Sequence, residues 1–179
     1  FHINERHQEM GRHALKQLGL SKDAWYVTLH VREPGYRGET LENTTENWRN
    51  ANPMDYIKAC EVITRAGGWV FRMGDPSMTP LPPMPQVIDY ALHEIRSDWM
   101  DVFLGAMCQF CIATPSGYYH IPMLFGKQIL FTNNVGFVQY FGLRNGSLFL
   151  PRWLKNFETD ELLSFEKFMS PPTSMLWST

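Results

Sequence analysis

Two basic side chains stand two residues apart where an apolar, β-branched run ends. The run over residues 25–31 reads WYVTLHV, and Arg32 follows it directly. Side chains alternate along a strand, so His30 and Arg32 project from the same face. An arginine fork holds phosphate oxygens bidentately, and a histidine donates a hydrogen bond or acts as a base. The pair suits an anion, although a backbone-bonded His30 and an ion-paired Arg32 fit the same short pattern.

A second candidate is the turn TPSG over residues 114–117, which follows the apolar run QFCIA. We predict that this turn leaves a strand and opens a helix. The first N–H groups of a helix are unsatisfied and carry a positive dipole end, which attracts phosphate. Thr114 and Ser116 add hydroxyls, and Gly117 lets a ligand approach the backbone closely. The alternative is that Ser116 caps its own helix. The patterns GxxxxGK[ST] and GxGxxG are absent.

A third group of candidates follows the run WVFRM at residues 69–73. We expect Arg72 to contribute to phosphate binding. The Asp75 carboxylate suits ribose hydroxyls or a base edge, or else it caps the following turn. Asp98 and Asp101 are interpreted first as residues of a helix N-terminus, where carboxylates are stabilised.

The polar segment 33–53 is too long for an ordinary connection, and such loops often carry function. Arg37, Arg49 and Asn50 are its candidates for folding over a ligand, with solvated surface as the plainer interpretation. No metal or other cofactor is expected, because the histidines at 30, 93 and 120 lack ligand spacing and no DxD occurs.

The elements that would position these residues alternate between strand and helix. We predict strands over 25–31, 69–73, 109–114 and 128–132, and helices over 5–18, 54–66, 87–95, 99–107 and 117–125. Gly19 should end the first helix, and Ser97 or Asp98 should cap the fourth. A last helix, capped by Thr159, should turn Leu162, Leu163, Phe165 and Phe168 inward. This order predicts an α/β fold with a mostly parallel sheet, in which ligands bind at the carboxyl ends of the strands.

Composition narrows the class of protein. The chain has 179 residues, 44% of them hydrophobic and 19% charged, with a formal net charge of −2. We expect one domain over residues 1–179, with a tail from 151, and no nucleic-acid partner. No apolar stretch approaches the roughly 18 residues of a membrane span. The three cysteines are predicted to be buried and reduced, which favours a cytoplasmic location.

Several motifs together resemble a family. YVTLHVREPGYR, RNA, GGWVFRMGDPSMTPLP, IDYA, RSDWMDVFLGA and TPSG occur in this order between residues 26 and 117. In this combination the chain resembles bacterial glycosyltransferases that accompany surface-polysaccharide genes. More distantly, it is similar to the donor half of fucosyltransferase-type enzymes of GT-B architecture. Their HxR, acidic strand end, SD-led helix and Ser-rich turn match His30, Arg32, Asp75, Asp98, Ser116 and Gly117.

The resemblance implies a Rossmann-like, C-terminal donor domain of an inverting, metal-independent enzyme. His30 and Arg32 would be catalytic, and a GDP-sugar is the favoured donor for transfer to a glycan acceptor. A GT-B enzyme needs a second Rossmann-like domain for the acceptor, and this chain has room for one. Because the chain starts at Phe1, we expect a fragment without that N-terminal domain. A sugar-nucleotide epimerase or phosphosugar enzyme, or a non-catalytic nucleotide-sugar-binding module, remains the alternative.

Overall fold

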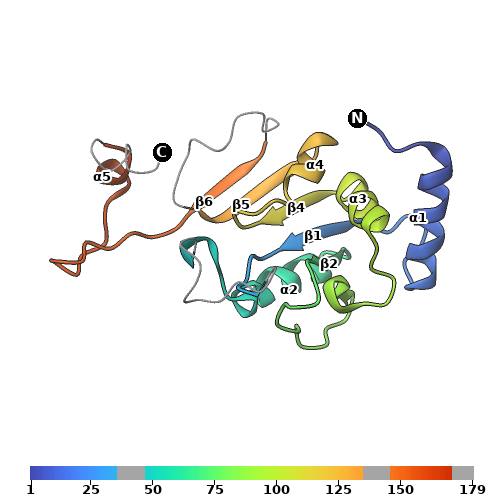
Figure 1. Cartoon of the computed structure of the whole chain (residues 1–179), viewed down its shortest axis with the longest axis horizontal. Helices are drawn as coiled ribbons and strands as arrows, with labels where there is room; N and C mark the ends of the chain where they lie inside the picture. Colours follow the sequence, from blue (N-terminus) through green and yellow to red (C-terminus); the bar gives the residue numbers. More distant parts are fainter. Residues whose placement is uncertain (36–46, 135–145, 171–179) are drawn as a thin grey trace.

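A computed structural model of the chain describes residues 1–35, 47–134 and 146–170. Its centre is a six-stranded sheet in the order β3-β2-β1-β4-β5-β6, and every pairing is parallel (Figure 1). The strands are β1 (Tyr26–His30), β2 (Trp69–Met73), β3 (Val87–Ile88), β4 (Phe110–Ala113), β5 (Gln128–Asn134) and β6 (Leu148–Pro151). This confirms the predicted α/β, Rossmann-like fold. The strand order reverses between β1 and β4, which is where such sheets open a crevice for ligands.

Helices cover both faces of the sheet. They are α1 (Glu5–Gln17), α2 (Ile57–Arg65), α3 (Asp98–Met107) and α4 (His120–Leu124), whereas the C-terminal α5 (Phe165–Met169) lies away from the sheet. Short 3-10 helices cover Asn47–Arg49, Pro53–Tyr56 and Tyr90–Leu92. Alternation along the strands separates two cores. Tyr26 and Phe71 pack with Phe103 of α3, whereas Val27 and Val70 pack with Cys60 of α2. His30 shares the parity of Tyr26, so it faces the side of α3.

Local signals explain most helix boundaries. The Asn4 side chain accepts a hydrogen bond from His7 N at 2.9 Å and caps α1. Gly19, at φ +92°, follows its end, as predicted. Ser97 occupies the N-cap position of α3, although its side chain makes no capping bond. All three cysteines are buried and free, as the sequence predicts.

The predicted helix over 87–95 is wrong. Val87 and Ile88 pair with Val70 and Phe71 as strand β3, and only Tyr90–Leu92 turn helically. The apolar spacing of this segment has a helical period, but its first two residues are β-branched and a proline-rich segment precedes them. Pairing with the sheet edge, which is invisible in a local pattern, decides the outcome.

The end of the chain also differs from prediction. The sequence does not predict β6, and α5 begins after Ser164, whose hydroxyl accepts from Lys167 N at 3.3 Å, rather than at Thr159. Leu162 and Phe165 are each 61% exposed, so they do not turn inward. The side chain of Phe168 lies outside the described part of the structure. Figure 1 shows this segment extending from β6 away from the sheet. Within the described ranges, no helix has the length and apolar character to cross a membrane.

Candidate functional site

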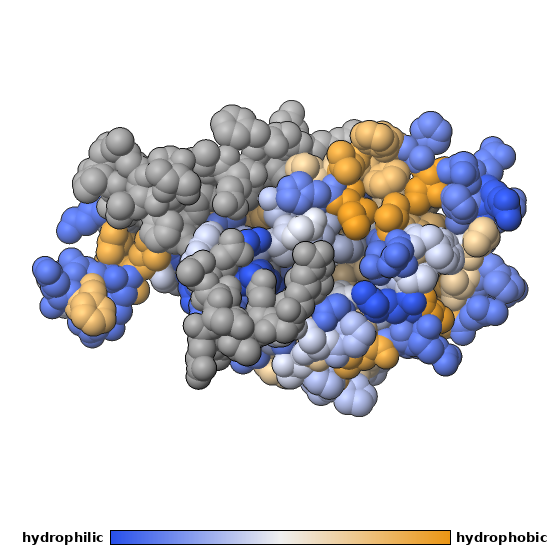
Figure 2. Space-filling model, viewed as in Figure 1, coloured by the Kyte–Doolittle hydropathy of each residue, from blue (hydrophilic) through white to orange (hydrophobic). Residues whose placement is uncertain are grey.

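A cavity of about 510 Å³ lies at the carboxyl ends of β1, β2 and β4, beside the point where the strand order reverses. In Figure 2, an apolar area covers α3 and α4. The volume falls within the roughly 300–1,000 Å³ of ordinary ligand pockets. Its walls are formed by His30, Arg32, Glu33, Arg49, Met73, Gly74, Asp75, Met78, Arg96, Asp101, Ser116, Gly117, Tyr118 and Ile121.

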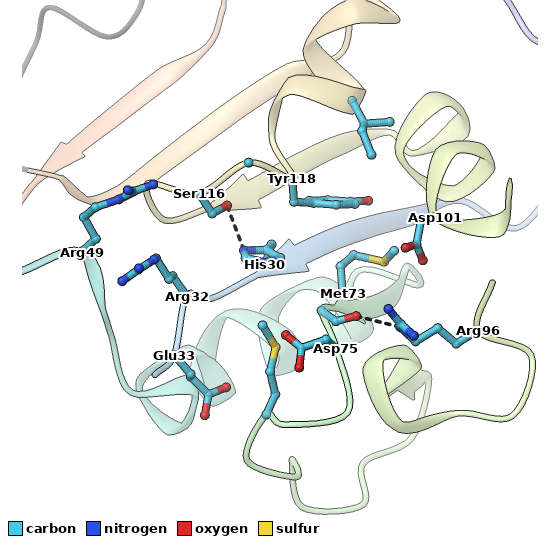
Figure 3. Close-up of a pocket in the computed structure, with 14 residues that line it drawn as sticks. His30, Arg32, Glu33, Arg49, Met73, Asp75, Arg96, Asp101, Ser116 and Tyr118 are labelled. Carbon is cyan, nitrogen blue, oxygen red and sulfur yellow. Dashed lines mark hydrogen bonds between the residues drawn. The ribbon is translucent and has the colours of Figure 1, made fainter. Parts of the chain in front are cut away.

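His30 and Ser116 meet across the point of strand reversal. The Ser116 hydroxyl lies 3.1 Å from Nδ1 of His30, and both side chains are buried (Figure 3). The imidazole also stacks on Tyr118, with ring centroids 5.4 Å apart. Burial, followed by the nearby Arg72 charge, lowers the pKa of His30 to about 4. The ring is therefore neutral at pH 7, and Ser116 fixes its orientation.

The turn after β4 differs from the predicted helix start. α4 begins at His120, so Ser116 and Gly117 precede it by a turn and Ser116 does not cap it. Instead, the backbone N–H groups of Ser116 and Gly117 donate to no described residue, and both residues line the cavity. Such N–H groups at a concave surface are suited to an anion. Phosphate binding at this turn would rest on its backbone and hydroxyl, not on a helix dipole.

Thr114 positions this turn rather than lining the cavity. Its hydroxyl accepts a hydrogen bond from Arg32 N at 2.7 Å, and Thr114 N donates to His30 O at 3.1 Å. Ala51 N in turn donates to Arg32 O at 3.0 Å. We call these three bonds the strand-end clasp. The clasp ties the residues after β1 to the turn after β4 and to the polar loop.

The polar loop reaches the cavity through Arg49, and its second candidate, Asn50, contacts the cavity residue Arg32. Arg32 Nη1 donates to Asn50 Oδ1 at 2.5 Å, and Arg49 Nε donates to Pro115 O at 3.1 Å. Asn133 Nδ2 donates to Asn50 O at 3.0 Å and holds the loop from β5. Arg32 and Arg49 therefore lie on the same side of the cavity (Figure 3). Arg37, the third candidate, lies outside the described residues.

Arg72 does not line the cavity, in contrast to the prediction of a phosphate ligand. Its side chain is fully buried and bonds Glu33 Oε1 at 2.5 Å and Asp89 Oδ1 at 3.0 Å. It also donates to Thr79 O at 3.0 Å. The reason is parity along β2, because Met73 faces the cavity and its neighbour must point to the other side. Arg72 thus connects the segments after β1, β2 and β3 through its contacts with Glu33, Thr79 and Asp89.

Of the two carboxylates predicted to belong to the site, Asp75 and Asp98, only the first lines the cavity. Asp75 lines the cavity, and its Oδ1 accepts from Ser77 N at 2.9 Å, so it caps the following turn, in line with the alternative interpretation. Asp98 is exposed at the start of α3 and does not line the cavity. The residue one turn later, Asp101, does so instead.

Arg96, Asp101 and Tyr118 are lining residues that were not among the predicted site residues. Arg96 Nε donates to Gly74 O at 3.0 Å, which directs the guanidinium along the cavity wall. Burial raises the pKa of Asp101, and the neighbouring Tyr90 hydroxyl and then the Arg96 charge partly offset this effect. Asp101 was visible in the sequence as the second acid of an Asp-x-x-Asp start. Which of the two acids faces the cavity depends on how α3 packs.

Gly117 offers a test of ligand approach at the turn. A Cβ at this position meets no described atom within 4 Å, and its φ is not in the left-handed region. If a diphosphate binds at this turn, Gly117→Ala should weaken its binding several-fold, because the added methyl group would occupy the space beside the backbone, and should leave the urea midpoint unchanged. Calorimetry and urea denaturation measure the two effects. Equal binding by variant and wild type would place the phosphate elsewhere.

Comparison with known proteins adds information about the fold. No protein-family model matches the chain, and no curated protein matches it. A solved structure, the glycosyl transferase family 9 protein from Veillonella parvula, is similar in fold, with a TM-score of 0.53 at 13% sequence identity. The likeness covers 94% of this chain and 46% of that one, so the chain spans about half the length of this neighbour. It supports the Rossmann-like architecture at the level of the fold.

Proposed function

We propose that this chain is the nucleotide-sugar-binding domain of an inverting, metal-independent glycosyltransferase of GT-B architecture. A GDP-sugar is the favoured donor, a glycan or related molecule is the acceptor, and a second domain binds that acceptor. The observation that carries the proposal is one cavity, at the strand-reversal point of a Rossmann-like sheet, lined by Arg32, Arg49 and the Ser116–Gly117 turn. A solved glycosyl transferase with the same fold supports it.

The chemistry of the proposal is stabilisation of a leaving group. As the bond between sugar and diphosphate breaks, negative charge grows on the departing phosphate. Arg32 and Arg49 supply positive charge on one side, and the Ser116 hydroxyl and the two N–H groups of the turn supply hydrogen bonds. Donors fixed in place before the reaction often provide the largest catalytic contribution. These groups would do what a metal does in other transferases.

His30 fits a positioning role better than that of a base. A pKa of about 4 makes its imidazole a weak proton acceptor at neutral pH. Its bond to Ser116 instead orders the hydroxyl that would face the phosphate. The base would then come from elsewhere, including the acceptor domain. Metal independence is a separate expectation, and unchanged sugar transfer in the presence of a chelator would support it.

Titration calorimetry with GDP, UDP and dTDP tests the proposal. Arg32→Ala should weaken binding about ten-fold or more, because a charge-assisted hydrogen bond contributes about 1.5–3 kcal/mol. Arg12→Ala removes an exposed arginine of α1, which does not line the cavity, and serves as the matched control. Loss of binding in both variants would point to net charge alone.

The two alternative functions predict different fates for a nucleotide sugar mixed with the protein. An epimerase would convert a nucleotide sugar with no acceptor present, and NMR of the sugar would show the product. A binding module would hold the nucleotide sugar without releasing the sugar, even beside an acceptor domain. No binding of any nucleoside diphosphate would overturn the proposal altogether.

A further inference from the structure

The imidazole of His30 has one ring nitrogen engaged by the protein and one open to the cavity. Nδ1 lies 3.1 Å from the Ser116 hydroxyl, and no described residue bonds Nε2. Nε2 is not enclosed by the protein either. The buried side-chain atoms that lack a partner among the described residues belong to Thr28, Arg72, Asp101 and Tyr118. Because His30 lines the cavity, a ligand can reach Nε2.

Two contacts fix the orientation of this ring. The Tyr118 ring stacks on it at an interplanar angle of 14°, and the Ser116 hydroxyl lies against Nδ1 (Figure 3). A half-turn of the imidazole would replace Nδ1 by a carbon atom and break the contact with Ser116. Thr114 N also donates to His30 O at 3.1 Å, which holds the backbone of the two partners together. The pair can therefore change by moving hydrogen atoms while the ring stays in place.

The hydrogen atoms of the pair can be arranged in two ways. An ordinary histidine, with a pKa of about 6.5, is mostly neutral at pH 7.5, and burial lowers the pKa of His30 further. A neutral imidazole carries one N–H, and a serine hydroxyl has one hydrogen to donate. If the hydroxyl donates to Nδ1, the ring hydrogen is on Nε2. If Nδ1 donates to the hydroxyl oxygen, Nε2 is a bare acceptor and the hydroxyl can donate elsewhere.

We propose that a diphosphate at the Ser116–Gly117 turn switches His30 from the Nε2–H to the Nδ1–H tautomer. This inference rests on the proposed function, which places the phosphate at the turn. Without a ligand, the hydroxyl has Nδ1 as its acceptor, and Nε2–H faces the cavity. A phosphate oxygen accepts hydrogen bonds, so the Ser116 hydroxyl rotates and donates to it. No hydrogen is then left for Nδ1, and Nδ1 must become the donor.

The switch leaves the charge of the pair unchanged. Nε2 releases a proton to solvent, and Nδ1 takes one up from solvent, so the imidazole stays neutral throughout. The Ser116 hydroxyl keeps its own hydrogen and only changes the atom to which it donates. Nε2 then offers a neutral acceptor beside the bound phosphate. Such an acceptor suits a hydroxyl group of the ligand and disfavours a carbonyl or carboxylate oxygen in the same place.

NMR of protein with isotopically labelled histidine nitrogens reads the tautomer directly, because a ring nitrogen that carries hydrogen resonates far from one that does not. At pH 7.5, saturating GDP should move the His30 hydrogen from Nε2 to Nδ1. The His30→Asn spectrum identifies the His30 signals by their loss. His120 is an internal reference: its Nδ1 lies 3.1 Å from Gly117 O, which only accepts. His120 should therefore show the Nδ1–H tautomer with and without GDP.

Ser116→Ala removes the hydroxyl that couples the ligand to the ring. GDP should still bind through the arginines and the N–H groups of the turn, about ten-fold more weakly. His30 should then keep the same tautomer when GDP binds. Ser97→Ala is the matched control, because the Ser97 side chain makes no capping bond and does not line the cavity. It should retain both the GDP affinity and the tautomer change.

The outcomes separate this switch from the proposed function. An Nε2–H tautomer in the GDP complex, or one tautomer that GDP does not change, would overturn the switch and leave the phosphate site intact. A tautomer change that persists in Ser116→Ala would do the same. If GDP does not bind, the proposed function fails, and inorganic pyrophosphate takes its place as the probe of the switch. Absence of binding by pyrophosphate as well would overturn both.

Discussion

Arg72→Met should destabilise the fold by about 3–5 kcal/mol, the usual cost of removing one partner from a buried ion pair. Arg72 is fully buried, and the substitution would leave Glu33 and Asp89 without their cation. Both carboxylates also hold backbone: Glu33 Oε2 accepts from Thr79 N at 3.0 Å, and Asp89 Oδ2 accepts from Leu81 N at 2.8 Å. The segment from 79 to 81 would therefore lose its anchors together with the pair.

Urea denaturation at pH 7 measures this effect. Arg65→Met on the exposed side of α2 is the matched control and should stay within about 0.5 kcal/mol of wild type. A second variant, Glu33→Gln, keeps an acceptor for Arg72 and should cost less than Arg72→Met. A loss below about 1 kcal/mol in Arg72→Met would mean that the buried charges relax into water, contrary to the ion pairs described above.

Acid should destabilise the wild type partly through His30. The pKa of His30 is about 4 in the folded chain and 6.5 when unperturbed. Between these values the unfolded chain binds a proton that the folded chain does not, so stability falls as pH falls from 6.5 towards 4. At about 1.4 kcal/mol per pKa unit, the His30 contribution is about 3 kcal/mol. It is fully present above pH 6.5.

His30→Asn should remove this share of the pH dependence while keeping a hydrogen-bonding side chain beside Ser116. The loss of stability between about pH 7 and pH 4.5 should be smaller in this variant than in wild type by about 2–3 kcal/mol. Carboxylates that titrate in the same range affect both proteins, and His13→Asn on exposed α1 controls for the removal of a histidine. If His30→Asn and wild type lost the same amount of stability on acidification, the imidazole would be hydrated and would titrate normally.

The sequence was sufficient where a local pattern determines the outcome. The run over 25–31 predicted β1, and the parallel arrangement brought His30, Ser116 and Asp75 to one edge of the sheet. The same alternation that placed His30 and Arg32 also explains why Arg72 turns away from the cavity beside Met73. Because Arg72 and Met73 are consecutive in β2, only one of them can face the cavity, and this much follows from alternation alone.

The features that the sequence did not predict depend on contacts between residues far apart in the chain. Arg72 meets Glu33, which lies 39 residues earlier, and no local pattern pairs them. β3 exists because Val87 finds Val70 at the sheet edge, although its spacing favours a helix. Asp98 and Asp101 are equivalent in sequence, and only the packing of α3 exposes the first and turns the second into the cavity.

The strand-end clasp has a further consequence for how a ligand would bind. One of its bonds joins residues 82 apart in the chain and holds them before any ligand arrives. The conformational entropy lost in bringing the residues after β1 next to the turn after β4 is therefore lost during folding. Few further residues of the protein should become ordered when a ligand binds. Differences in affinity among ligands should then follow the contacts they make. The amide protons of Arg32 and Thr114 should exchange slowly with solvent even in the unliganded protein.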